Sequence, residues 1–335
     1  MAALAVVGGL AVAALAAGWD VGSWLGEFWD ILSSISPGYL VATFALKTLQ
    51  TGFSAAAWFG ILRYAYPASR ISYVQVAACY ATGAAVSNVT PANAGTLVTV
   101  LMLVAIIPGA TVAGVLAATA VEKLFFAVVG TLVFLYLFIS VGGSFERKFG
   151  FLSEHPWTWS LVALAVAIVV IVGGRFARRR LEQFWEQART GGKILSDRRA
   201  YLTRVVAPQL LAWSCKVAVV GVLLAAYGIP VGFHTLLSVM AGNQLANVAS
   251  LTPGGVGVNQ AFNVASLHDV TDPATASAYS IANQVLTTVW NWVLAAVLVA
   301  VAFGRSGGRR LVEESSARAR ELKKRGDKPS SGSAS

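Results

Sequence analysis

The chain has 335 residues, of which 56% are hydrophobic and only 12% are charged, and its formal net charge is +10. Soluble proteins have about 25% charged residues, so this composition excludes an ordinary soluble enzyme and a disordered chain. Apolar runs recur along the whole chain and indicate a protein that lies in the lipid bilayer.

Six apolar segments are predicted to span the membrane, because a hydrocarbon core about 30 Å thick needs roughly 20 helical residues. In chain order they lie at about 2–18, 38–62, 111–140, 158–173, 205–228 and 274–303. The first ends in small residues, as a signal peptide does, but no basic residue precedes it. We therefore expect a retained helix there.

Two further apolar segments, 72–107 and 234–267, are each interrupted near the middle. The interruptions are Thr90-Pro91 and Thr252-Pro253-Gly254-Gly255. Proline removes a backbone donor and glycine frees the chain from helical geometry, so a helix should break at both places. Each arm is marginal in length for a full span. We favour a re-entrant hairpin in each segment, with two short full spans as the alternative.

The distribution of basic residues predicts the orientation. The 174–204 loop has nine basic and three acidic residues, and the 304–335 tail has nine basic and four acidic residues, so both should be cytoplasmic. The 19–37 connection has no basic residue and should lie outside. The +10 charge is therefore an orientation signal rather than evidence of nucleic-acid binding. Both termini are expected in the cytoplasm.

The two halves of the chain resemble each other. A shift of 162 residues places the first Thr-Pro break on the second and places Glu122 on Gln284. Both halves, about 38–140 and 205–303, have the order helix, broken hairpin, helix, and their predicted orientations are opposite. The fold class expected is thus an all-α polytopic membrane protein with an inverted-topology repeat, which in transporters places the substrate site at the repeat interface.

We expect one transmembrane domain over residues 1–305. It includes the basic cytoplasmic loop at 174–204 and is followed by a basic, partly disordered cytoplasmic tail at 306–335.

Four charged residues lie inside predicted spans: Lys47, Glu122, Lys123 and Lys216. Each costs about 2.5–3.5 kcal/mol at a helix centre, so such a charge usually has an interior partner or faces a wet cavity. Our hypothesis is that Lys47 and Lys216 face a central cavity and attract an anionic headgroup. The alternative for Glu122 and Lys123 is a position near the helix end, from which the lysine reaches the interface.

The hairpin tips bring polar side chains and free backbone N–H groups to membrane depth, where they could bind phosphate. The alternative is that these groups only satisfy the broken backbone. The tip residues considered for substrate binding, together with the repeat-related glutamine, are Asn88, Thr90, Pro91, Asn93, Gly95, Ser250, Thr252, Pro253, Gly254, Gly255, Gly257, Asn259, Gln260 and Gln284.

Other site chemistry has no support in the sequence. The two cysteines and three histidines are scattered, without metal-ligand spacing, and no catalytic triad, carboxylate pair or nucleotide motif is present. We therefore expect no cofactor, no metal and no enzymatic activity.

Three motifs together resemble the flippase-like, lysylphosphatidylglycerol synthase transmembrane family. They are Asn88-Val-Thr-Pro-Ala-Asn-Ala-Gly95, Ala120-Val-Glu122-Lys123 and Thr252-Pro-Gly-Gly-Val-Gly257. The resemblance implies a multi-pass protein of the bacterial plasma membrane that moves a lipid or lipid-linked headgroup between leaflets. Some members carry a soluble aminoacyl-transfer domain after the membrane part. This chain ends in a short tail, so lysyl-lipid synthesis is not expected.

The sequence also departs from the family pattern. Thr96 stands where the family commonly has an acid, and Asn259-Gln260 stands where it has an Arg-Glu pair. These differences bear on proton coupling and on the choice of headgroup.

The first hypothesis is thus a translocator for an anionic phospholipid or a polyprenyl-linked headgroup. The alternatives are a non-transporting scaffold for a separate lipid-modifying enzyme or glycosyltransferase, and a carrier for a small solute. The partners expected are membrane lipids, with a membrane enzyme partner and a homo-oligomer left open.

Overall fold

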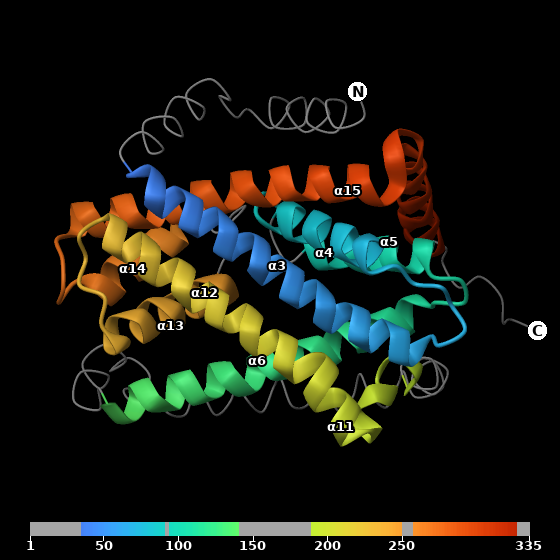
Figure 1. Ribbon diagram of the computed structural model, residues 1–335, viewed down its shortest axis with the longest axis horizontal. Coiled ribbons are helices and arrows are strands. Elements are labelled where there is room, and N and C mark those ends of the chain that lie inside the picture. Colours follow the sequence, from blue (N-terminus) through green and yellow to red (C-terminus); the bar gives the residue numbers. More distant parts are fainter. Residues whose placement is uncertain (1–34, 91–93, 141–188, 250–256, 327–335) are drawn as a thin grey trace, which may run out of the picture.

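The computed structural model describes residues 35–90, 94–140, 189–249 and 257–326, which form helices joined by turns and contain no strand (Figure 1). The helices are α3 (Pro37–Ala65), α4 (Tyr73–Ser87), α5 (Ala94–Ile106), α6 (Val112–Ser140), α11 (Arg198–Tyr201), α12 (Ala207–Ala226), α13 (Phe233–Ala249), α14 (Val258–Leu267) and α15 (Pro273–Gly326). A short 3-10 helix (Lys193–Ser196) and a π-helical segment (Leu202–Val206) flank α11. The all-α prediction is confirmed for these residues.

Three helical stretches among the described residues are long and apolar enough to cross a membrane: Val112–Val133, Arg198–Ala226 and Pro273–Gly304. They coincide with three of the predicted spans. The predicted span at 38–62 is also a single long helix, α3, but its polar side chains make it less apolar than these three. The predicted spans at 2–18 and 158–173 lie outside the described residues.

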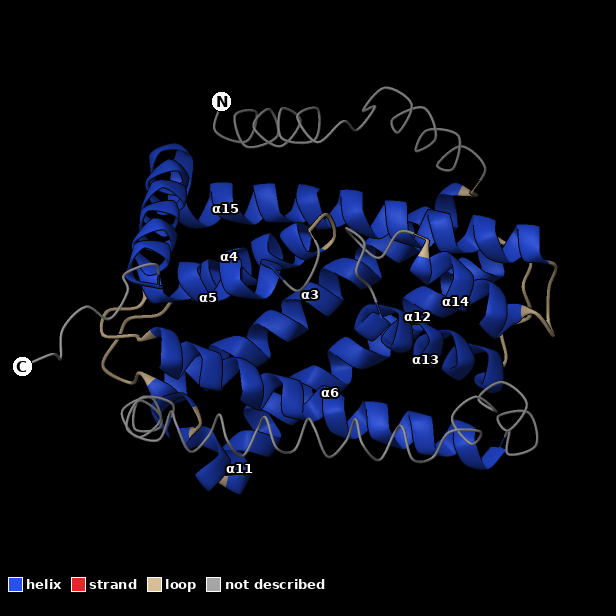
Figure 2. Cartoon of the chain, turned by 180° about the vertical axis from the view of Figure 1, so that it is seen from behind, coloured by secondary structure: helices blue, strands red, loops and turns tan. Residues whose placement is uncertain are grey.

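Both predicted helix breaks are present. The helix α4 ends at Ser87 and α5 begins at Ala94, while α13 ends at Ala249 and α14 begins at Val258. In each case the two short helices pack against each other as a helical hairpin. The two hairpins lie toward opposite ends of the molecule's long axis, as Figure 2 shows from behind.

Small residues allow the two arms of the first hairpin to approach closely. A Cβ atom on Gly95 would overlap the carbonyl oxygen of Gly83 and the hydroxyl of Ser87, so the backbones of α4 and α5 are in contact here. Close backbone approach through small residues is a common way in which helices associate in lipid. Lipid tails are as apolar as the helix surface, so the hydrophobic effect does not drive helices together and close packing has to. Glycine is therefore required at this contact by packing.

The buried apolar residues form two main cores. The first joins α3, α4, α5 and α6 with the 194–205 region, and the second joins α12, α13, α14 and α15 with the beginning of α3. The helices α3 and α12 connect them, since these two pack together more extensively than any other described pair (Figure 1).

The two connecting helices run antiparallel. Gly60, near the end of α3, lies against Arg204, just before α12, so that an added Cβ would come within 2.7 Å of the Arg204 carbonyl oxygen. At the other end, Phe44 of α3 packs against the core that contains Leu223 of α12. Residues at matching steps along the two helices therefore face one another.

The helix α15 continues past the predicted end of its span at residue 303. Its backbone bends at Gly304, where φ is 65°, and helix then extends to Gly326. A positive φ of this kind costs glycine little, which explains why the bend falls on this residue. The tail is helical over 306–326. Its remaining residues, 327–335, lie outside the described part, so the expected partial disorder stays a prediction.

Candidate functional site

Helix α3 has one polar face. Four polar side chains, Thr43, Lys47, Gln50 and Ser54, follow each other at intervals of four, three and four residues. This spacing places them on one side of a helix. Thr43 and Ser54 are buried, and Lys47 and Gln50 are half-buried, so this face points into the protein rather than toward lipid.

Helix α12 contributes two polar residues to the same region. Gln209 and Lys216 are seven residues apart and so share a helix face. The side chain of Gln209 is completely buried, and Lys216 is half-buried. Both sit in a helix that is otherwise rich in leucine, valine and alanine.

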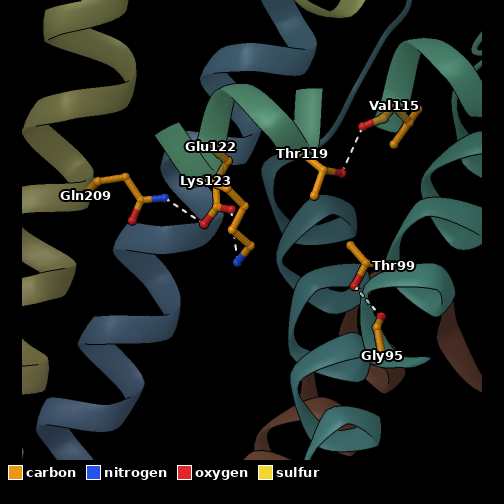
Figure 3. A network of polar contacts seen from close by, with 7 residues as sticks. All are labelled: Gly95, Thr99, Val115, Thr119, Glu122, Lys123 and Gln209. Carbon is orange, nitrogen blue, oxygen red and sulfur yellow. Dashed lines mark hydrogen bonds and ion pairs between the residues drawn. The ribbon is translucent and has the colours of Figure 1, made fainter. Parts of the chain in front are cut away.

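The acidic member of the site is Glu122 on α6, whose side chain is also completely buried. The Gln209 Nε2 atom donates a hydrogen bond of 3.1 Å to Glu122 Oε1 (Figure 3). The Nζ atom of Lys123 lies 3.2 Å from Glu122 Oε2, and 59% of the Lys123 side chain is exposed. Glu122 thus has one neutral donor inside the protein and one cation at its edge.

The lysines lie close enough to influence one another. Lys47 is near Lys216, and Lys216 is in turn near Lys123. Tyr80 of α4 is close to Glu122 and Lys123 and to Ser54 of α3. We call Lys47, Glu122, Lys123, Gln209 and Lys216 the charged cluster.

The charged cluster has an excess of positive charge, since it contains three lysines and one glutamate. One carboxylate can offset only one ammonium group, and removing charges from water costs several kcal/mol per ion unless each is compensated. The two remaining lysines could therefore attract a diffusible anion such as a phosphate. Four predicted site residues, all from the intramembrane charges, are thus brought together here.

The sequence also predicts a central cavity that Lys47 and Lys216 face. An open apolar groove is lined by residues of α12 such as Trp213, Val217 and Gly221, together with Tyr39 of α3. Neither Lys47 nor Lys216 lines the groove. The hypothesis that the two lysines face a cavity stays a prediction.

The first hairpin tip is described only in part. Thr90 Oγ1 donates to the Val86 carbonyl oxygen at 2.7 Å, which satisfies a group at the end of α4, and Asn88 follows the last residue of that helix. Gly95 serves the close packing of α4 and α5. These contacts match the structural alternative for the tip. The other tip residues considered, Pro91, Asn93, Ser250, Thr252, Pro253, Gly254 and Gly255, lie outside the described residues.

The second half contains a neutral polar group of residues. Gln260 Oε1 accepts from the Gly257 N–H at 2.6 Å, and Gln260 Nε2 donates to Gln284 Oε1 at 3.0 Å. Gly257 has a φ of 83°, which glycine tolerates, and it precedes the first residue of α14. Asn259 also interacts within the protein. Three of the residues considered for binding are thus joined by hydrogen bonds.

A second set of polar contacts lies on α13, α14 and α15. Asn263 Nδ2 donates to Ser280 Oγ at 2.9 Å and to Asn243 Oδ1 at 3.2 Å, which connects α14 with α15 and α13. Asn263 and Ser280 are both buried. We call Gln260, Gln284, Asn243, Asn263 and Ser280 the amide network.

Five residues of these groups were not predicted from the sequence: Gln209, Tyr80, Asn243, Asn263 and Ser280. Gln209 could have been predicted as a site residue, because it is a polar residue seven positions from Lys216 in an apolar helix. The contacts of Asn243, Asn263 and Ser280 depend on how three helices pack, which no single-helix pattern reveals. Within the described part of the chain, no group of three His, Cys, Asp or Glu side chains could hold a metal ion.

These features define a helical membrane protein with charged and polar residues buried between its helices. The chain belongs to the family described as the lysylphosphatidylglycerol synthase TM region, whose model matches residues 3–297. That membership indicates a lipid-related function in a membrane. No curated protein matches the chain, and no solved structure matches it.

Proposed function

We propose that the protein moves an anionic phospholipid or a polyprenyl-linked headgroup between the leaflets of the bacterial plasma membrane. The headgroup would pass the charged cluster between α3, α6 and α12, with its lipid tail remaining in the bilayer. The termini would be cytoplasmic, in keeping with the basic loop and tail. The protein would not itself be an enzyme.

The observation that carries this proposal is the excess of lysine around one buried glutamate. Glu122 is fully buried and Lys47 and Lys216 lie near each other, although like charges repel. A protein that needed only stability would favour apolar residues of similar size at these positions. An anionic group that binds transiently would offset this repulsion.

The arrangement of the hairpins supports a mechanism of alternating exposure. Each half contributes one broken helical hairpin, and the repeat correspondence between Glu122 and Gln284 suggests that the halves are inverted copies. In transporters built in this way, one repeat rocks against the other around a site near the midplane. Here the first hairpin would enter from the cytoplasmic side and the second from outside.

The test is translocation by the purified full chain in lipid vesicles. Fluorescent phosphatidylglycerol, phosphatidylcholine and a labelled polyprenyl phosphate would each be placed in the vesicles, and the fraction reaching the other leaflet would be followed by chemical quenching. The proposal predicts protein-dependent movement of an anionic probe. If no lipid moves and a lipid-modifying enzyme or glycosyltransferase binds stably, the scaffold role replaces it, and uptake of a small solute would indicate a carrier.

A further inference from the structure

Two carboxamide oxygens, one from Gln209 in the charged cluster and one from Gln50 on the same face of α3 as Lys47, are buried without a donor among the described residues. Gln209 Oε1 and Gln50 Oε1 accept no hydrogen bond from any residue that the structure describes. The orientation of Gln209 follows from its chemistry, because its amide nitrogen must face the acceptor oxygen of Glu122. Its own oxygen is thereby left pointing away from that hydrogen bond.

Gln50 and Gln209 each share a helix face with one lysine of the cluster. Gln50 is three residues from Lys47 on the polar face of α3, and Gln209 is seven residues from Lys216 on α12. Since Lys47 and Lys216 lie near each other, each acceptor oxygen belongs to a helix face that also carries one of these ammonium groups.

Buried acceptors of this kind are costly unless they are paired. A buried polar group without its partner costs about 1–3 kcal/mol, so native proteins pair nearly all of them. The lysine ammonium groups supply positive charge to bind a phosphate, whereas the two glutamine oxygens can accept hydrogen bonds only from a donor. A headgroup that carries both a phosphate and a hydroxyl would satisfy both kinds of group.

We propose that Gln50 and Gln209 determine specificity, by accepting hydrogen bonds from a hydroxyl-bearing headgroup whose phosphate is bound by the lysines. This inference rests on the proposed translocation. It selects hydroxylated anionic headgroups, such as a glycerol or a sugar linked to phosphate, over equally charged headgroups that lack hydroxyl groups. Discrimination of this type is strong, because the analogue without the hydroxyl leaves the acceptors of the site unpaired.

The test compares lipids with the same charge. Phosphatidylglycerol and phosphatidylmethanol both carry one negative charge, but only the first has free hydroxyls. Labelled polyprenyl methyl phosphate and polyprenyl phosphate linked to a sugar, both phosphodiesters with one negative charge, form the corresponding pair for polyprenyl carriers. The full chain in vesicles should move the hydroxylated member of at least one pair about tenfold faster than its partner, the ratio expected from about 1.4 kcal/mol.

Two variants test whether Gln50 causes the preference for the hydroxylated lipid. Gln50→Leu should reduce the rate ratio within that pair to about one. Thr51→Val is the matched control on the same helix, since the Thr51 hydroxyl already donates to the Lys47 carbonyl oxygen at 3.0 Å, and it should keep the ratio. Because the wild-type comparison needs no substitution, a misfolded variant does not prevent the test.

Two results would overturn the inference in different ways. Equal rates for both members of each pair in the wild-type protein contradict the role of the glutamines but leave translocation intact. A lack of protein-dependent movement for every probe contradicts the proposed translocation, and the inference falls with it.

Discussion

The charged cluster and the amide network differ in location and in chemistry. In the charged cluster, Glu122 of the first half pairs with Gln209 of the second half and with Lys123, and Lys47 and Lys216 lie near one another. In the amide network, which lies within the second half, Gln284 pairs with Gln260, and the neighbouring contacts join only amides and a hydroxyl. Both regions therefore bury hydrogen-bonding groups between helices, but only the charged cluster buries charge.

This difference separates two roles that buried polar groups can have in a membrane. A neutral network connects helices at a modest energy cost, because it carries no charge and most of its groups find a partner, although Asn263 Oδ1 has none among the described residues. A charged site costs more and is retained where it contacts an ion, a proton or a substrate. The proposed function thus places headgroup binding at the charged cluster, where the two halves meet, and helix connection in the amide network.

The largest difference between the halves should come from their hairpin glycines. Gly95→Ala should lower the free energy of unfolding by about 3 kcal/mol, because the new Cβ would overlap backbone atoms of α4 that cannot move away easily. Gly242→Ala should cost about 1 kcal/mol, since the nearest atom to its Cβ, at 2.5 Å, is the movable Ser266 hydroxyl. Thermal unfolding of the purified variants in detergent would measure both.

Gly38→Ala is the control for these glycine variants. A Cβ at this position of α3 would meet no atom within 4 Å, so its stability should equal or slightly exceed that of the wild type. Equal losses for Gly95→Ala and Gly242→Ala would show that the two hairpins pack alike.

The next largest effect should come from Gln209→Leu. It removes a buried donor from Glu122, and an unpaired buried group costs about 1–3 kcal/mol, with charged groups at the upper end. The double variant Glu122→Leu/Gln209→Leu should recover part of this loss, because it leaves no unpaired carboxylate in the protein interior. Unfolding of the single and double variants gives the coupling energy, and independent additive losses would contradict a functional contact between these side chains.

The smallest effect should come from the amide network. Gln284→Leu removes one neutral acceptor from Gln260 Nε2 and should lower the free energy of unfolding by about 1 kcal/mol. Its effect on translocation of an anionic lipid should be less than that of any substitution of a lysine in the charged cluster. A greater loss of transport for Gln284→Leu than for Lys216→Ala would reverse the roles assigned to the charged cluster and the amide network.

Much of the fold could be predicted because lipid restricts what a sequence can form. A span must be a long apolar helix, so the segment at 38–62 corresponds closely to α3 at Pro37–Ala65. The helix breaks were predictable from proline and glycine, which act locally. The helix beyond Gly304 was not, because its polar residues resemble a loop and the bend depends on one positive φ.

Individual charged residues of the site could be predicted from the sequence, but not how they pair with residues of other helices. A lysine or glutamate within an apolar run can be recognised from the sequence as a candidate site residue, because charge in a membrane is costly. The pairing of Glu122 with Gln209 joins residues 87 positions apart and depends on how α6 packs against α12, which the composition of neither helix indicates. The π-helical segment at Leu202–Val206, just before Gln209, likewise has no pattern in its sequence.

The central claim is that the lysines of the charged cluster move an anionic headgroup, and the most direct measurement is the rate at which fluorescent phosphatidylglycerol changes leaflet. In vesicles that contain the full chain, Lys47→Ala/Lys216→Ala should reduce this rate at least about tenfold, equivalent to about 1.4 kcal/mol in the barrier. Lys193→Ala/Arg198→Ala removes the same charge from two exposed positions outside the cluster and should leave the rate unchanged. A folded Lys47→Ala/Lys216→Ala variant that moves the lipid at the wild-type rate would contradict the account.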